Sequence, residues 1–256
     1  MENVLDPNYV PEEYKVPYDV IELPSQGLLY PNKKNSVKIE YLTAMDENVL
    51  SSPNIIGSGK VLDVLIERKV KDLGFTVDQL LEGDRLAIIV FLRTTAFGTE
   101  YKQAILNTKN DVVEGTIDLS KLKQKKLIIK PDENNEFDFV LPQGKNKVKF
   151  RFLNSKDEKE IVEKDEFTKK KFDTEVSFYN TLKLERMVME IDGNRDKMFI
   201  TNFIEKRMTI MDSRKLNKFI SDNEPGLNFN TTARTDEEES VECFLRLGKS
   251  FFWPEL

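Results

Sequence analysis

The sequence predicts an α+β protein with a helical core lobe, a small antiparallel β region in the middle, a second helical lobe and extended termini. Three patterns lead to this class. Apolar residues recur at helical spacing between 59 and 94 and again between 182 and 220. Strand-like runs occupy 101–152, and both chain ends are rich in proline and aromatic residues. With 39% hydrophobic residues among 256, the chain has enough apolar side chain to bury a real core.

These patterns divide the chain into four segments. An extended N-terminal arm covers 1–22, and a mainly helical first lobe covers 23–100. The antiparallel β region covers 101–154. The second helical lobe, with an extended aromatic C-terminal tail, covers 155–256.

The arm and the turn after it are defined by proline, glycine and aromatic residues. Residues 1–22 combine prolines and acids with the spaced tyrosines Tyr9, Tyr14 and Tyr18, which favours an extended segment with aromatic anchors. The following LPSQGLLY places Pro and Gly at turn spacing, and alternating apolar residues then predict a half-buried strand at 37–43.

Helices are predicted in the rest of the first lobe. Thr43 suits a helix cap, and an amphipathic helix is expected between Gly59 and Val70. Thr76 is predicted to cap a short helix through 81, and Asp84 to begin a core helix through 94 that is dense in apolar residues.

The remainder changes from strands to helices and back. The runs KLIIK, FDFVL and VKFRF predict strands between turn-rich stretches. The highly charged segment 155–173 predicts a solvated helix with a narrow apolar stripe. Apolar periodicity at 182–191, 199–208 and 216–220 predicts further helices, and the tail from 228 becomes extended again.

Composition excludes several classes of protein. The absence of histidine removes the commonest metal ligand and the side chain that titrates nearest neutral pH. The single Cys243 permits no internal disulfide and no multi-thiolate zinc site. The net charge of −6 disfavours nucleic acid as a partner. We also expect no secretion signal and no membrane span, because the longest apolar run, Leu86 to Leu92, is far shorter than the roughly 20 residues that cross a bilayer.

Three motifs have simple structural interpretations. GSGK at 57–60 resembles part of a phosphate-binding loop, but the full pattern is missing and a turn that caps a helix is the favoured interpretation. Acid pairs such as Asp46 and Glu47 are expected to be exposed to solvent. The lysine clusters 123–126 and 169–171 are expected to form solvated faces. We therefore assign no catalytic, cofactor-binding or metal-binding residue.

The aromatic chain ends are the strongest candidates for partner binding. Phe251, Phe252, Trp253 and Pro254 bury little at a chain end unless that end docks on a partner or folds back on the second lobe. The tyrosines of the arm present the same choice, with disorder as a third option.

The order of motifs along the chain resembles the baseplate protein family of T4-type bacteriophages. The resemblance extends over about 20–256, and its most specific parts are the LPSQGLLY opening, the stretch from EGDR to FGTEY and the FFWP ending. The residues that match the opening and central motifs, with roles expected to be structural, are Leu23, Pro24, Ser25, Gly27, Tyr30, Arg93, Phe97, Gly98 and Tyr101.

This resemblance implies a non-enzymatic structural or assembly subunit of the central baseplate hub of a contractile tail. Its implied partners are other tail and hub proteins, with the tape-measure protein among the candidates, in a hetero-oligomer. The implied locations are the host cytoplasm during assembly and the tail baseplate of the virion if the subunit is retained. The alternatives are a transient tail-assembly chaperone that is absent from the mature virion and, more remotely, a carboxylate-dependent hydrolase.

One departure from the family concerns cysteine. Several relatives carry paired cysteines near the stretches that match 107–110 and the region of Cys243, whereas this chain has a single cysteine. If those pairs hold zinc in the relatives, packing or partner contact must stabilise the same places here, so no metal is carried over.

Overall fold

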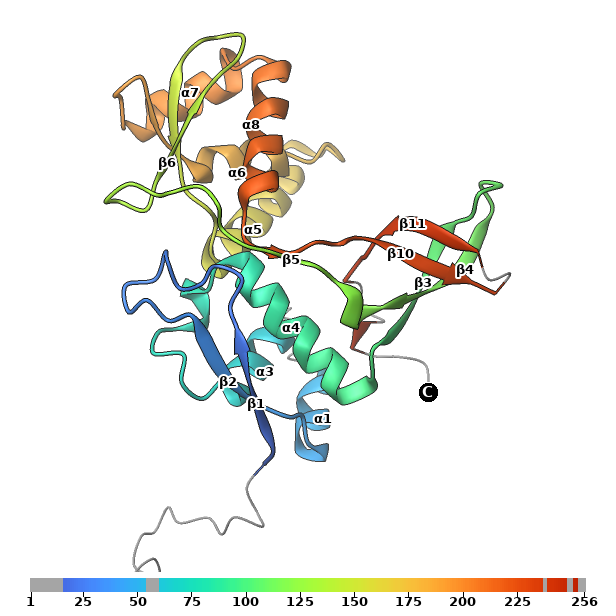
Figure 1. Ribbon diagram of the computed structural model, residues 1–256. Helices are drawn as coiled ribbons and strands as arrows, with labels where there is room; N and C mark the ends of the chain where they lie inside the picture. The colour runs from blue at the N-terminus through green and yellow to red at the C-terminus, as the bar shows by residue number, and fades with distance from the viewer. Residues whose placement is uncertain (1–15, 54–59, 237–238, 248–250, 253–256) are drawn as a thin grey trace, which may run out of the picture.

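The chain forms two lobes with separate hydrophobic cores (Figure 1). The computed structural model describes residues 16–53, 60–236, 239–247 and 251–252. Helices and small antiparallel sheets occur in both lobes, which confirms the α+β class.

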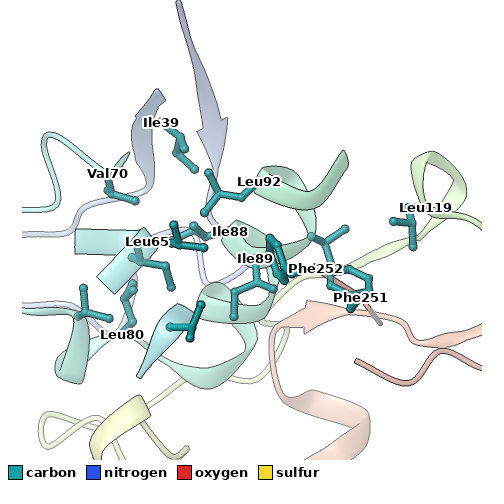
Figure 2. Close-up of a cluster of buried hydrophobic side chains, with 14 of the residues drawn as sticks. Ile39, Leu65, Val70, Leu80, Ile88, Ile89, Leu92, Leu119, Phe251 and Phe252 are labelled. Atoms are coloured by element: carbon teal, nitrogen blue, oxygen red, sulfur yellow. The ribbon is translucent and has the colours of Figure 1, made fainter. Parts of the chain in front are cut away.

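Helix α4 (Glu82–Phe97) is the central element of the first lobe. Its apolar residues cover more than one face, so neighbours pack around it on several sides. Ile88, Ile89 and Leu92 are at most 1% exposed, and Figure 2 shows them within the core cluster. The neighbouring elements of this lobe are β1 (Tyr18–Glu22), β2 (Ser36–Glu40), α1 (Ala44–Leu50), α3 (Val61–Lys69) and the 3₁₀ turn η2 (Val77–Gln79).

Helix α1 begins at the predicted cap residue, Thr43, whose N–H and hydroxyl donate to Asp46. Asp46 is fully buried, which corrects the expectation that it is exposed. Burial alone would raise the pKa of Asp46, but the ammonium of Lys69, at 2.5 Å, and the guanidinium of Arg68, at 3.0 Å, lower it to about 2. The carboxylate therefore ties α1 to the end of α3.

A curled four-stranded antiparallel sheet completes the first lobe, in the order β11-β10-β4-β3. Its strands are β3 (Glu100–Leu106), β4 (Val112–Asp118), β10 (Asn230–Thr235) and β11 (Ser240–Phe244). Packing on the inner face is tight at Gly115, where a Cβ atom would lie 2.4 Å from the Cδ1 atom of Ile105 and would require that side chain to shift. The side chain of Gln103 donates to the carbonyl of Phe244 and accepts from the N–H of Arg246, so the chain after β11 is tied to edge strand β3.

The second lobe packs helices against a three-stranded sheet in the order β6-β7-β8. Phe137, Phe150 and Phe152 form a buried aromatic group in its core. The elements of this lobe are β6 (Phe137–Val140), β7 (Lys147–Phe150), α5 (Ser155–Phe172), α6 (Tyr179–Met187), β8 (Val188–Ile191), α7 (Lys197–Lys206) and α8 (Ile210–Asn223).

Two short strands connect the lobes. The chain leaves the first lobe through β5 (Gln124–Lys125) and returns through β9 (Gly226–Leu227), and these strands pair antiparallel. Figure 1 shows the two connections running side by side. The second lobe is therefore an insertion between β4 and β10 of the first.

This topology corrects two expected boundaries. The segment 101–154 is not a single β region, because β3 and β4 join the first lobe whereas β6 and β7 join the second. The segment 155–256 is likewise divided, since β10 and β11 return to pair with β4. Pairing between strands so distant in sequence is fixed by tertiary packing and leaves no local pattern.

Some elements also differ from their predicted form. The run KLIIK, residues 126–130, forms no strand; only the two residues before it form β5. The periodic segment 182–191 changes from helix α6 to strand β8 at Val188. Helix α4 begins before Asp84, which lies buried in its first turn. The predicted helix start is therefore two residues too late, and Asp84 is a buried, hydrogen-bonded carboxylate within the helix.

Candidate functional site

The junction between the lobes forms a cavity of about 340 Å³ that is partly open to solvent and is lined by several ionisable side chains. Elements of both lobes and both connecting strands contribute to it. The ionisable residues that line it are Glu82 from α4, Lys125 from β5, Glu158 from α5, Tyr179 and Lys183 from α6, and Glu224 at the end of α8.

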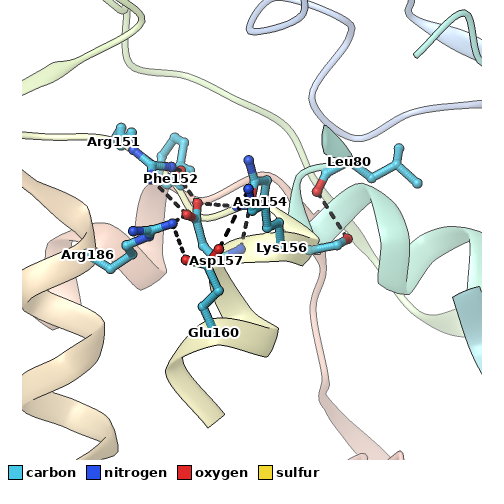
Figure 3. Close-up of polar contacts among 9 residues, drawn as sticks. Leu80, Arg151, Phe152, Asn154, Lys156, Asp157, Glu160 and Arg186 are labelled. Atoms are coloured by element: carbon cyan, nitrogen blue, oxygen red, sulfur yellow. Dashed lines mark hydrogen bonds and ion pairs between the residues drawn. The ribbon is translucent and has the colours of Figure 1, made fainter. Parts of the chain in front are cut away.

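The junction is held in place by backbone pairing and by a capped helix. The N–H of Ser155 donates to the carbonyl of Leu80 at 2.8 Å, and the N–H of Glu82 donates to that of Leu153 at 3.2 Å. Figure 3 shows Asp157 in the first turn of α5. Its carboxylate accepts hydrogen bonds from both terminal nitrogens of Arg151 and from the Nε atom of Arg186. The start of α5 is thereby fixed against β7, α6 and the first lobe.

Glu82 has a strongly perturbed carboxyl group at the junction. Burial raises the pKa of Glu82 to about 7, Arg85 partly opposes this shift, and the negative charges of Glu158 and Glu224 add to it. One carboxyl oxygen, Oε1, lies 3.4 Å from Arg85. The other, Oε2, is buried and has no hydrogen-bond partner among the described residues. Ionised Glu82 is therefore poorly compensated.

Glu158 and Tyr179 face Glu82 from the second lobe. The hydroxyl of Tyr179 donates a hydrogen bond to Glu158 Oε1. Burial, followed by the hydrogen bond to Glu158, raises the pKa of Tyr179 well above its usual value. Tyr179 therefore stays protonated and acts as a donor at neutral pH.

Glu224, at the end of α8, is the third carboxyl group of the cavity, after Glu82 and Glu158. Burial raises its pKa, while Lys183 and Lys125 act in the opposite direction. Lys125 is also held to α8 by a 2.9 Å hydrogen bond to the carbonyl of Ser221. Three carboxyl groups thus share the cavity with two lysines.

This arrangement can take up and release a proton near neutral pH, because at least one carboxyl group has a pKa close to 7. Such groups occur both in general acid–base sites and in proton-sensitive interfaces. Among the described residues, no group of three or more Asp, Glu, His or Cys side chains has the geometry to hold a metal ion.

The predicted motif residues of the opening segment meet α4 in a separate buried network. The N–H and hydroxyl of Ser25 donate to Asp84 at 2.9 and 2.5 Å, and the hydroxyl of Tyr30 donates to the same carboxylate at 2.6 Å. Leu23 and Pro24 are buried beside them. Gly27 has φ +70°, and a Cβ atom there would lie 2.6 Å from the backbone of the following turn, so glycine is required.

The central motif and the C-terminal aromatics form a second network. Arg93 donates to the carbonyls of Gly98 and Glu100, and its guanidinium lies over Phe97 and Phe251. Tyr101 packs edge-on against Phe251, with 5.1 Å between the ring centroids. Gly98 has φ +82° and ends α4. These residues anchor the chain end to the first lobe.

The predicted partner-binding residues lie in different environments. Phe251 and Phe252 are 1% and 3% exposed in the first-lobe core, which corrects both their assignment to a partner surface and the expected fold-back onto the second lobe (Figure 2). Tyr18 is 51% exposed on β1, with Lys38 over its ring. Tyr9, Tyr14, Trp253 and Pro254 lie outside the described residues, as does most of the GSGK segment.

Replacing Phe251 with alanine is expected to lower the free energy of unfolding by about 3 kcal/mol, because it removes a buried ring and leaves a cavity beside Tyr101 and Arg93. Urea unfolding followed by circular dichroism measures this loss. Phe167→Ala, at a ring that is 66% exposed, is the matched control and should change stability little. Equal effects of the two substitutions would contradict the anchoring role of Phe251.

A hydrogen bond connects the stretch 107–110 with the turn before the strand that carries Cys243. The hydroxyl of Thr108, in the turn after β3, lies 3.2 Å from Glu239 in the turn before β11. Cys243 is half-buried on β11, and burial raises the pKa of its thiol.

The sequence did not single out the junction residues. Glu82 does lie within the EGDR stretch, and an acid at the start of so apolar a helix is a usable signal. Glu158, Tyr179 and Glu224 are separated by long stretches of chain and share no periodicity with Glu82. Only the paired connections bring them together.

No protein-family model, no curated protein and no solved structure matches the chain. In the described part of the chain, no helix is both long enough and apolar enough to cross a membrane.

Proposed function

We propose that the chain is a structural or assembly subunit of the central baseplate hub of a contractile bacteriophage tail and acts through contacts with other hub proteins. The motifs behind this family resemblance lie in the two buried networks around α4. Their residues hold the first lobe together, as expected for motifs that preserve an architecture.

The observation that carries a contact role is the exposure of large apolar side chains on projecting parts of both lobes. Leu106 and Val112 are exposed on the curled sheet, and Phe167, Phe172 and Val176 are exposed along α5 and the segment after it. Figure 1 shows the sheet extending away from the helices. Adjacent exposed apolar groups are a feature of protein–protein contact sites, and Leu106 and Val112 lie opposite each other on β3 and β4.

The arm tyrosines supply a direct test of this proposal. The full-length triple variant Tyr9→Ser, Tyr14→Ser, Tyr18→Ser is expected to recover about tenfold less of the other tail proteins in copurification from infected cells, because aromatic anchors dominate interface energies. Unfolding curves of the isolated variant should match those of the native chain, since Tyr18 is half exposed.

The matched control is Met198→Ser, which removes an exposed apolar side chain on α7 that is not among these contact residues. Full recovery of tail proteins with the triple variant would contradict a binding role for the arm. Mass spectrometry of purified virions distinguishes a resident subunit, present at fixed stoichiometry, from a chaperone that departs before maturation.

The junction cavity favours one second candidate, a carboxylate-dependent hydrolase. Its support is that three carboxyl groups face one cavity and that the pKa of Glu82 is near neutral. Peptidoglycan turnover by the native chain that is lost in Glu82→Gln would favour this candidate. Absence of turnover in the native chain would remove it.

A further inference from the structure

The connection between the lobes has the form of a hinge. Within the described residues, the chain crosses between the lobes at two places, and both crossings lie in one antiparallel pair that joins Gln124 to Leu227 and Lys125 to Gly226. Two adjacent crossings permit rotation of one lobe relative to the other, because little backbone must change conformation.

Among the described residues, a limited set of contacts closes the lobes on each other away from this pair. The polar ones include the bonds between 80–82 and 153–155, the ion pairs of Lys159 with Asp63 and Asp78 at 2.6 and 2.7 Å, and a 3.4 Å contact from Asn135 to the carbonyl of Leu29. The apolar ones include Leu29 and Leu81 of the first lobe, which pack on the core of the second. Because Lys159 is partly exposed, its ion pairs contribute modestly. The closed arrangement is therefore sensitive to any repulsion at the junction.

The junction carboxyl groups come from both sides of this hinge. Glu82 belongs to the first lobe, whereas Glu158 belongs to the second and Glu224 ends the second lobe at the return connection. Glu82 Oε2 is buried without a partner among the described residues. If Glu82 ionises, no hydrogen bond from the described residues stabilises the charge on Oε2, and the charge is repelled by Glu158 and Glu224.

We propose that the junction is a proton-controlled hinge, in which the lobes close over Glu82 when it is protonated and separate about the β5–β9 pair when Glu82 and Glu224 are ionised. The closed state shields Glu82 Oε2 from water. The open state hydrates this oxygen and the neighbouring carboxyl groups.

The charged groups around Glu82 determine the direction of the pH effect. Arg85 on α4 favours the ionised form, whereas Asp63 on α3, Glu158 on α5 and Glu224 on α8 disfavour it. Around Glu224, Lys183 and Lys125 favour ionisation and Glu158 disfavours it, yet burial dominates and raises the pKa. Tyr179 remains a neutral donor to Glu158.

The sign follows from these shifts. In the closed state the pKa of Glu82 is about 7, compared with an ordinary value of 4.5 in a hydrated, open junction. The closed state is therefore fully favoured below the ordinary value and is weakened as the pH rises through about 7. Glu82 alone changes the closing equilibrium by at most about 300-fold.

The test measures the distance between the lobes beside the contact from Asn135 to the carbonyl of Leu29, where a residue of each lobe lies close to the other. Spin labels at Leu28→Cys and Glu133→Cys, both exposed positions, are placed in a full-length Cys243→Ser chain. Pulsed electron spin resonance is then recorded from about pH 5 to about pH 9. We expect a single short distance at low pH and a longer, broader population above about pH 7.

Glu82→Gln is expected to keep the short distance at high pH, and Glu82→Gln with Glu224→Gln should do so more completely. Glu163→Gln, an exposed acid on α5, is the matched control and should follow the native chain. A native distance that does not depend on pH would overturn the proposal, as would equal opening in Glu82→Gln. So would loss of the far-ultraviolet circular dichroism signal at the same pH, which indicates unfolding. The isolated chain suffices, so the outcome is independent of any role in a hub.

Discussion

Replacing Asp84 with alanine is expected to lower the free energy of unfolding by about 4 kcal/mol. This fully buried carboxylate accepts three hydrogen bonds from the opening segment, two from Ser25 and one from Tyr30. The substitution leaves those donors buried without an acceptor, which costs more than the loss of the bonds themselves. Urea unfolding of the isolated chain measures the change.

Two variants make this result specific. Tyr30→Phe removes one donor, and its effect should be much smaller in the Asp84→Ala background than in the native chain, with a coupling energy of about 1 to 2 kcal/mol. Glu163→Ala removes an exposed acid and should change stability by less than about 0.5 kcal/mol. If Asp84→Ala behaved like Glu163→Ala, the network would have no stabilising role.

Replacing Gly83 with alanine is expected to destabilise the chain by about 3 kcal/mol, opposite in sign to the usual effect of this change in a helix. The return connection passes directly over the first turn of α4, and a Cβ atom at Gly83 would lie 1.8 Å from the carbonyl oxygen of Pro225. Backbone must move to relieve this overlap, and that movement disturbs the junction. Thermal unfolding of the variant measures the loss.

Helix propensity is tested separately by Ala96→Gly, at an exposed position of the same helix, which should cost about 1 kcal/mol. Gly83→Ala should also weaken amide protection in β9, because the connection is displaced. A stabilising effect of Gly83→Ala would show that the connection does not pack on α4 as described.

Most local structure could be predicted from periodicity and capping residues. The spacing of apolar residues predicts α3 and α4, and Thr43 and Thr76 cap the elements expected of them. The charged segment after 155 forms the long helix α5 that its composition predicts. These elements depend on neighbours within a few residues, so their signals are contained in short stretches of sequence.

The candidate site could not be predicted in the same way. The motif residues Ser25 and Tyr30 were identified as members of one set, but the carboxylate that accepts from both, Asp84, was expected only to begin a helix. Phe251 and Phe252 were identified as aromatic anchors, but they pack in the first-lobe core of the same chain and not on a partner.

The sequence by itself determined the α+β class, most helices and the chemical character of the motif residues, because each depends on local spacing and residue type. Only the tertiary structure decided that the second lobe is an insertion, that β4 pairs with β10, and that Glu82, Glu158 and Glu224 face one cavity. The physical reason is that the burial of a charge and the pairing of distant strands depend on which surfaces exclude water together. No short stretch of sequence contains that information.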